Sequence, residues 1–215
     1  MALINKLTAI GNAIRSKTGG TDKLTLDQMP NAIRSISGSG SSENRLAALC
    51  DNTLTAVTAE DFGAATRIKE NTFFDNTNLT SVEIPNTITS IGKAAFSGTG
   101  ITRLEVPESV RTVSSWAFSH CDSLLTATLN HGVSTLDSYC FFDCSILNDI
   151  HIPVSVDYIG EKALAATDLQ NIYYGGTRED WLAIDIDSTN NESLYGYNGT
   201  LDAPGMGAPT IHFNS

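Results

Sequence analysis

Residues 79–96 read Leu79-Thr-Ser-Val-Glu-Ile-Pro85-Asn-Thr-Ile-Thr-Ser-Ile91-Gly-Lys-Ala-Ala-Phe96 and contain two signatures that recur along the chain. The first signature starts again at Ile101, Leu124, Leu147 and Leu169, and the second ends at Phe73, Phe96, Phe118, Phe141 and Leu164. The steps between the ends of the second signature are 23, 22, 23 and 23 residues. A globular domain does not keep so constant a period, so the sequence predicts a repeat array.

Each repeat is expected to form one coil of a solenoid that packs on the coils before and after it. Val82-Glu83-Ile84 alternates apolar and polar residues, as in a short β-strand with one buried face. Stacked copies of this strand predict a parallel sheet along one face of the solenoid. Proline cannot donate to a strand ladder, so the strands are expected to end at Pro85, Pro107 and Pro153. The inward side chains of one copy are expected to be Leu79, Val82, Ile84, Ile88, Ile91 and Phe96.

The position before each anchor residue is expected to be small and buried. Ala95, Ala117, Cys140 and Ala163 occupy it. Cys121 and Cys144 each lie three residues after an anchor phenylalanine, so we expect them to stack in adjacent coils as a ladder of small side chains. A disulfide between them is the alternative, and it requires an oxidising compartment. The four cysteines form no paired C-x-x-C units, so no zinc site is predicted.

The outward strand positions are where we expect ligand binding. They change from copy to copy while the inward positions stay apolar, so the fold does not dictate them. A solvated polar face without a ligand is the alternative. One column is Glu83, Glu105, Thr128, His151 and Tyr173, and the other is Ser81, Arg103, Thr126, Asp149 and Asn171. Tyr173, Tyr174 and His151 are expected to lie together, and aromatic groups beside polar ones suit sugar or protein ligands. Trp116 would mark a contact patch if it were exposed.

The pattern L-x-x-[VI]-x-[IV]-P-x-[ST]-[VI]-x-x-I-G-x-x-A-F-x-x-[CT] resembles the BspA-like leucine-rich repeat family over residues 54–175. The copy at 124–146 departs from it, with Asn130 where proline is usual and Leu136-Asp137 in place of Ile-Gly. Residues 172–181 resemble the segment that ends such arrays, and residues 209–213 resemble its last strand. The resemblance implies a leucine-rich-repeat solenoid that binds rather than catalyses, as in bacterial surface adhesins and phage tail proteins.

The amino-terminal residues predict a separate helical segment. Leu3, Leu7, Ile10 and Ile14 recur at steps of four, three and four, which indicates an amphipathic helix over residues 2–17, and a second short helix is expected over 30–36. Helices this short are marginal alone, so the stripe is expected to pack within the chain, to self-associate or to dock. The predicted organisation is a helical segment 1–36, a Gly/Ser linker 37–45, a repeat solenoid 46–175 and a C-terminal cap 176–215.

Residues 7–33 resemble a short module found in tail and baseplate proteins of tailed phages and prophages. With the repeats, this resemblance implies a non-enzymatic virion protein that recognises a glycan or protein on the host surface. Its N-terminal helices would bind other tail or baseplate proteins or form a homo-oligomer, with a trimer favoured. The sequence start shows no basic region followed by a long apolar one, so no signal peptide is predicted and the expected location is the virion tail. The alternatives are a bacterial adhesion or protein-interaction module, a decoration protein without a receptor and, more remotely, a hydrolase.

Composition and motifs exclude other classes. The 215 residues carry 13 Lys and Arg against 24 Asp and Glu, a net charge of −11 that argues against nucleic-acid binding. No run of about 18 apolar residues exists, so no membrane insertion is expected. G-x-S-x-G, H-E-x-x-H and P-loop motifs are absent, and we predict no catalytic residue and no cofactor. No metal is predicted: His120 is expected as a solvent-facing loop residue beside buried Cys121, and residues 185–192 match a calcium loop only in part.

Overall fold

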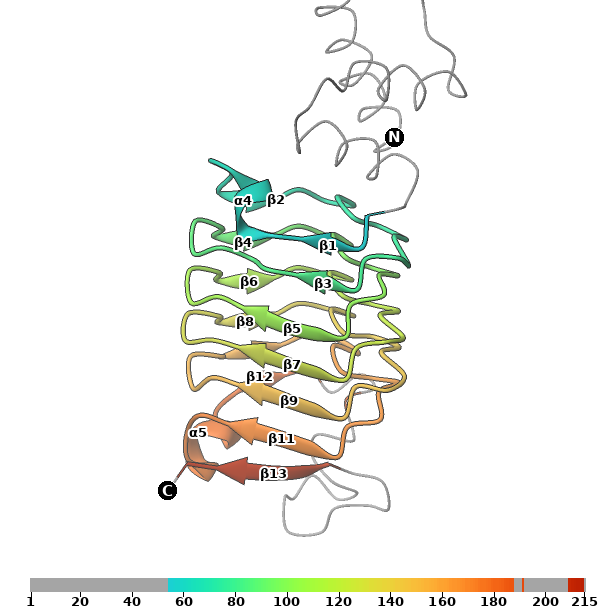
Figure 1. Ribbon diagram of the computed structural model, residues 1–215. Coiled ribbons are helices and arrows are strands. Elements are labelled where there is room, and N and C mark those ends of the chain that lie inside the picture. Colours follow the sequence, from blue (N-terminus) through green and yellow to red (C-terminus); the bar gives the residue numbers. More distant parts are fainter. Residues whose placement is uncertain (1–53, 188–190, 192–208, 215) are drawn as a thin grey trace, which may run out of the picture. The chain divides into compact units, whose positions relative to one another are not determined.

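The computed structural model describes residues 54–187, 191 and 209–214, which form a parallel β-solenoid (Figure 1). Successive turns follow one another along a single axis, and every strand pairs in parallel with an equivalent strand of a neighbouring turn. This confirms the repeat array that the 22- and 23-residue period predicts. The expected helices at 2–17 and 30–36 and the linker lie outside the described residues.

The first sheet carries the predicted strands. Its five strands are β5 (Arg103–Val106), β7 (Thr126–Leu129), β9 (Asp149–Ile152), β11 (Asn171–Tyr174) and β13 (Thr210–Phe213). A separate two-stranded sheet is made by β1 (Ala56–Val57) and β3 (Ser81–Val82). Pro107 and Pro153 follow the ends of their strands as predicted, whereas β3 ends at Val82, before Pro85 is reached, and β7 ends at Leu129, before Asn130. The strands therefore end because of the geometry of the turn, and proline is compatible with that turn but is not required for it.

A second sheet, which the sequence did not lead us to expect, runs along another side of the solenoid (Figure 1). Each of its strands has only two residues, so no alternating pattern marks it. The strands are β2 (Arg67–Ile68), β4 (Ser90–Ile91), β6 (Thr112–Val113), β8 (Thr135–Leu136), β10 (Tyr158–Ile159) and β12 (Asp185–Ile186). Leu136-Asp137 replaces Ile-Gly without disturbing this sheet, because Asp137 accepts hydrogen bonds from the Ser115 hydroxyl and the Ser138 amide, both at 2.8 Å.

The core consists of columns of equivalent side chains, one from each turn. Phe73, Phe96, Phe118 and Phe141 stack in sequence with ring centroids 5.0, 5.2 and 5.4 Å apart, and Leu164 occupies the next position. Ala95, Ala117, Cys140 and Ala163, which precede the anchors, are fully buried as predicted. Val82 is the exception among the expected inward side chains, since it is only half-buried.

The turns that carry the anchor residues form a third hydrogen-bonded side. In each turn two residues adopt a left-handed backbone, and in all but the last of these turns their N–H groups donate to carbonyls of the following turn. The first column of such residues is Asn71, Ala94, Trp116, Tyr139 and Lys162, and the second is Asp75, Gly98, His120, Asp143 and Ala166. The left-handed conformation is thus repeated by the fold, whatever side chain stands there.

Short helices lie at the two ends of the described solenoid. Helix α4 (Ala59–Phe62) follows β1, and α5 (Arg178–Leu182) lies between β11 and β12. Helix α5 begins with a capping box, in which Thr177 and Asp180 satisfy each other's backbone amides, and it buries Trp181 against the Tyr174 ring, with centroids 5.1 Å apart. In the part of the chain covered by the structure, neither helix has the length or the apolar character that crossing a bilayer requires.

Candidate ligand-binding surfaces

The outward positions of the five-stranded sheet form the two columns that the sequence predicts. Parallel pairing in register aligns Glu105, Thr128, His151 and Tyr173 in one column, and Arg103, Thr126, Asp149 and Asn171 in the other. All of these side chains are exposed or half-buried. Ser81 belongs to β3, in the separate two-stranded sheet, and Glu83 follows directly after it.

Strand β13, in the segment expected as the last strand of the array, extends both columns by one residue. Its register places Thr210 beside Asn171 and His212 beside Tyr173. The imidazoles of His151 and His212 stack on the two faces of the Tyr173 ring, with centroids 4.6 and 4.7 Å away and planes within 14° and 13° of parallel. We call these three residues the ring stack. It is exposed, and Tyr173 is 37% accessible.

Tyr174 is not part of this surface, so its expected position beside Tyr173 and His151 is wrong. It is 2% exposed and points into the core against Trp181. Neighbouring residues of a strand face opposite sides, and Tyr173 already takes the outer one. Burial raises the pKa of the Tyr174 phenol, which stays neutral in its apolar surroundings.

A chain of polar contacts fixes the residues next to the ring stack. The Asn171 amide nitrogen donates to Asp149 at 2.7 Å, and its amide oxygen lies 3.0 Å from Nε2 of His212. Since the amide oxygen is an acceptor, Nε2 of His212 carries the proton in this arrangement. A ligand would therefore meet rings whose positions are already set, which lowers the entropy lost on binding.

An open groove with a volume of about 580 Å³ lies where the chain leaves β3, β5 and β7. Its acidic lining comes from Glu83, Glu105 and Glu108. The Asn130 amide donates to Glu105 at 3.1 Å, so the residue that replaces proline in this copy interacts with the same wall. The groove is polar and negatively charged, and it differs in character from the ring stack on the same sheet.

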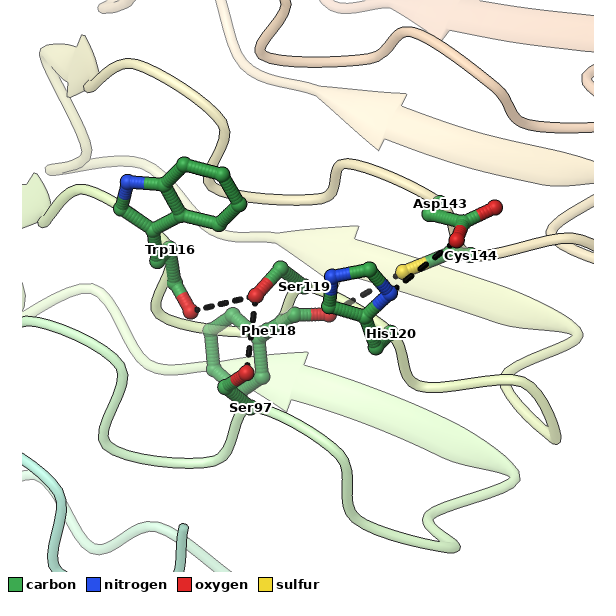
Figure 2. A network of polar contacts seen from close by, with 7 residues as sticks. All are labelled: Ser97, Trp116, Phe118, Ser119, His120, Asp143 and Cys144. Atoms are coloured by element: carbon green, nitrogen blue, oxygen red, sulfur yellow. Dashed lines mark hydrogen bonds and ion pairs between the residues drawn. The ribbon is translucent and has the colours of Figure 1, made fainter. Parts of the chain in front are cut away.

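Aromatic side chains also gather on the turns, in a group we call the turn cluster: Trp116, Tyr139, Phe142 and His120 (Figure 2 shows Trp116 and His120). Trp116 lies flat on Tyr139, with centroids 4.2 Å apart and planes within 6°. The Phe142 ring meets Trp116, Tyr139 and His120 edge-on, at 5.8, 5.4 and 5.8 Å. Trp116, Tyr139 and Phe142 are half-buried and His120 is exposed.

Hydrogen-bonded polar groups surround these rings. His120 Nδ1 lies 3.0 Å from Asp143 Oδ2 (Figure 2). The Tyr139 hydroxyl donates to Glu161 at 2.8 Å, a bond that raises the pKa of the phenol, with burial and the nearby carboxylate charge adding to the effect. The Lys162 ammonium lies 5.5 Å from the Tyr139 ring centroid, within the range of a cation–π contact.

The backbone under the turn cluster is strained. Trp116 and Tyr139 have φ values of 62° and 63°. This conformation costs about 1–2 kcal/mol for each residue with a side chain, whereas Asn and Gly adopt it readily. An aromatic pair gains about 0.5–1.5 kcal/mol beyond its burial. Ala94 and Lys162 adopt the same conformation in other turns, so the cost belongs to the fold, and the fold does not require large rings at these two positions.

The residues beneath the turn cluster are buried and give it no catalytic nucleophile. Ser119 donates to the Trp116 carbonyl at 3.1 Å and pairs with the Ser97 hydroxyl at 2.9 Å (Figure 2). Ser119 is fully buried while His120 faces solvent, so the His120–Asp143 pair does not activate this serine. His120 thus lies as expected, exposed beside buried Cys121.

Cys121 and Cys144 are buried free thiols in adjacent turns, which confirms the ladder that we preferred to a disulfide. The Cys144 thiol donates to the Phe118 carbonyl at 3.1 Å (Figure 2), and Thr99 continues the column at 3.3 Å from the Cys121 sulfur. The hydrogen bond to Cys121 and burial raise the pKa of Cys144, and burial raises that of Cys140. Both thiols therefore stay protonated and unreactive near neutral pH.

Metal ligands are not grouped anywhere in the described ranges, where no three His, Cys, Asp or Glu side chains converge. The partial calcium-loop match at 185–192 lies mostly outside the described residues. Within it, Asp185 belongs to β12, and the buried Asn191 amide donates to the carbonyls of Gly160 and Asp187 at 2.8 and 2.7 Å.

Comparisons with known proteins agree with this architecture. A family model described as the BspA type leucine-rich repeat region matches residues 66–181 in six copies. Among solved structures, the pneumococcal vaccine antigen PcpA is 16% identical with a TM-score of 0.44, and the match covers 63% of this chain and 30% of that one. A leucine-rich repeat protein from Bacteroides ovatus is 20% identical with a TM-score of 0.33, covering 57% and 44%.

A leucine rich cell surface protein from Faecalibacterium prausnitzii is 19% identical with a TM-score of 0.26, covering 66% of this chain and 65% of that one. The chain thus spans less than two thirds of each of these three structures. Among curated proteins, no match was found.

Proposed function

Because the chain belongs to the BspA-type leucine-rich repeat family, we propose that it is a non-enzymatic binding protein that recognises a cell-surface glycan or protein with the exposed face of its five-stranded sheet. The observation that carries this proposal is the ring stack of His151, Tyr173 and His212. Three parallel rings stand on a face whose side chains the fold leaves free to vary.

The residues around the ring stack suit recognition rather than catalysis. Asp149 and Asn171 supply hydrogen-bonding groups one column away, and they are held by contacts of 2.7 and 3.0 Å to each other and to His212. Rigid aromatic rings beside fixed polar groups are typical of binding surfaces. The ten predicted residues of the two columns remain candidates, with those on β9 and β11 favoured because β13 adds to them.

This proposal is tested by binding experiments with the labelled full-length chain. The chain is applied to an array of bacterial surface polysaccharides and animal-cell glycans, and to intact bacteria. Tyr173→Ala should reduce binding at least about tenfold. Tyr158→Ala is the matched control, because Tyr158 is an outward, half-buried tyrosine of the other sheet. Equal binding by both variants, or loss in both, would contradict a site on the five-stranded face.

We propose the virion tail as the setting, with a receptor on the bacterial host. Support comes from the resemblance of residues 7–33 to a tail and baseplate module. In this setting Leu3, Leu7, Ile10 and Ile14 attach the chain to other tail proteins or form a trimer. A bacterial adhesion or protein-interaction module is the second candidate, favoured by family membership alone, and it accounts for the described residues equally well. A decoration protein without a receptor is the third.

The mass of the full chain in solution separates these settings. A trimer would weigh three times the 22.9 kDa of one chain by light scattering. Leu7→Glu combined with Ile14→Glu should convert it to monomer, while Thr8→Glu, outside the apolar stripe, should not. A monomeric wild-type chain would refute self-assembly, and mixing with separate tail proteins would then test docking.

A further inference from the structure

The turn cluster has a property that the proposed function leaves unexplained. Large rings occupy two successive positions of the first left-handed column, where the strained backbone favours Asn or Gly. Elsewhere in that column stand Asn71, Ala94 and Lys162, so the fold requires no ring there. The left-handed backbone recurs in every turn and belongs to the fold, so what distinguishes this place is the pair of large rings.

The rings form a rigid platform with an uncovered end. Trp116 stacks on Tyr139 on one side, at 4.2 Å. The equivalent position of the preceding turn is Ala94, which carries no ring, and the His120 ring lies 6.5 Å from Trp116 with planes within 20°. Phe142 braces both rings edge-on, at 5.8 and 5.4 Å. Trp116, Tyr139 and Phe142 are each half-buried, so part of each ring is presented to solvent in a fixed arrangement.

The polar groups at the rim favour an uncharged, hydroxyl-rich ligand. Asp143 is paired with His120, and Glu161 accepts from Tyr139 and lies in the turn that supplies Lys162. Opposite charges are thus mixed around the rings, which gives no strong attraction for an ion. Each carboxylate has more acceptor sites than the one contact described, so both can accept a hydroxyl proton.

The size of the cluster argues against a protein partner. Its rings come from two adjacent turns, which lie about 5 Å apart, whereas a stable protein interface involves about 20–30 residues on each side. A platform of this width matches one or two sugar rings, whose apolar C–H faces stack on aromatic rings while their hydroxyls reach the rim.

We propose that Trp116, Tyr139 and Phe142 form a carbohydrate-binding site for a neutral pyranose unit, with its hydroxyls bound by the His120–Asp143 pair and Glu161. The site lies on the turns, away from the columns of the five-stranded sheet, and it does not depend on the function proposed for that face. It gives the solenoid a second contact with a polysaccharide.

Affinity electrophoresis of the full-length chain in native gels tests the site directly. The gels would contain, one at a time, a mannan, a galactan, an α-glucan and a β-glucan. We expect at least one polymer to retard the wild-type chain. Trp116→Ala should weaken that retardation at least about tenfold in apparent Kd, and Ala94→Tyr should weaken it too, because a ring at position 94 would cover the indole face.

Two controls separate this site from the one proposed on the sheet. Tyr173→Ala should leave the retardation unchanged, and Tyr158→Ala should do the same. The sequence has two tryptophans, and Trp181 is 1% exposed, so quenching of tryptophan fluorescence by the retarding polymer reports on Trp116. Asp143→Asn keeps the shape of the rim and should reduce affinity less than Trp116→Ala.

Three results would overturn the proposal. The first is no retardation of the wild-type chain by any of the four neutral polymers. The second is retardation that survives both Trp116→Ala and Ala94→Tyr. The third is loss of retardation in Tyr173→Ala while Trp116→Ala is retarded as strongly as wild type. That result would assign the polysaccharide to the sheet face instead. Circular dichroism of each variant establishes that it is folded before its affinity is compared.

Discussion

Two aromatic ladders run side by side through this solenoid, one inside and one outside. The inner ladder has four phenylalanines, Phe73, Phe96, Phe118 and Phe141, with centroids 5.0–5.4 Å apart. The outer ladder, Trp116 on Tyr139, stacks more closely, at 4.2 Å. The inner one recurs with the repeat and excludes water, whereas the outer one spans two turns and stands on strained backbone. Similar stacking geometry thus serves stability in one place and surface chemistry in the other.

The largest effect is expected from truncating the inner ladder at its middle. Phe118→Ala removes a fully buried ring between two others, and it should lower the free energy of unfolding by about 3–5 kcal/mol. Urea unfolding followed by circular dichroism measures this loss. Phe73→Ala, at the edge of the ladder where the ring is 7% exposed, is the comparison and should cost less. Equal losses of unfolding free energy in the two variants would mean that packing between two neighbouring rings adds nothing to the stability of Phe118.

An intermediate effect is expected from the buried pair of hydroxyls of Ser97 and Ser119. Ser119→Ala removes the partner of Ser97, whose hydroxyl lies 2.9 Å away and is buried. A buried donor left unpaired costs about 1–3 kcal/mol, so the free energy of unfolding should fall by that amount. The double variant Ser97→Ala/Ser119→Ala removes both groups and should recover part of the loss. Additive losses in the double variant would show that the two hydroxyls act independently.

A small effect is expected from the outer ladder. Trp116→Asn removes a half-buried ring and places a residue that tolerates the left-handed backbone, so the two changes oppose each other. The free energy of unfolding should change by less than about 1 kcal/mol. A loss comparable with that of Phe118→Ala would make Trp116 a core residue, and the contrast between the ladders would fail.

The smallest effect concerns pH and the Tyr139–Glu161 hydrogen bond. That bond raises the pKa of Tyr139 in the folded chain above its unfolded value of about 10. The contribution of this hydrogen bond to the free energy of unfolding is therefore complete below about pH 10, and it is lost as the pH rises through the folded-state pKa of Tyr139. Tyr139→Phe should differ from wild type in unfolding free energy below pH 10 and converge with it above. A difference that grows with rising pH would contradict the assignment.

The inner ladder and the outward columns could be predicted because both follow from periodicity. A period of 22 or 23 residues fixes which side chains stack, and alternation in four-residue strands such as Asn171–Tyr174 fixes which face they take. The same rule should have separated Tyr174 from Tyr173, since adjacent strand residues cannot share a face.

Other features had no local signal in the sequence. His212 joins the ring stack beside Tyr173 through the register of β13 on β11, which no repeat motif specifies. The strands of the second sheet have two residues each, too few for a pattern. Half of the left-handed positions hold Trp, Tyr, Lys or Ala, residues that avoid this conformation, so propensity alone does not reveal the columns.

The backbone hydrogen bonds between turns also determine how the molecule would respond to tension. They run along the solenoid axis on the three sheets and on the turns, and β1 and β13 lie at opposite ends of the described region (Figure 1). A force pulling these ends apart would break the hydrogen bonds between one pair of turns before those of the next, so the turns would unfold one at a time. Each turn of 22 or 23 residues would release about 75 Å of chain. Under load, the repeats would act as an extensible tether that lengthens in steps while the remaining turns stay folded.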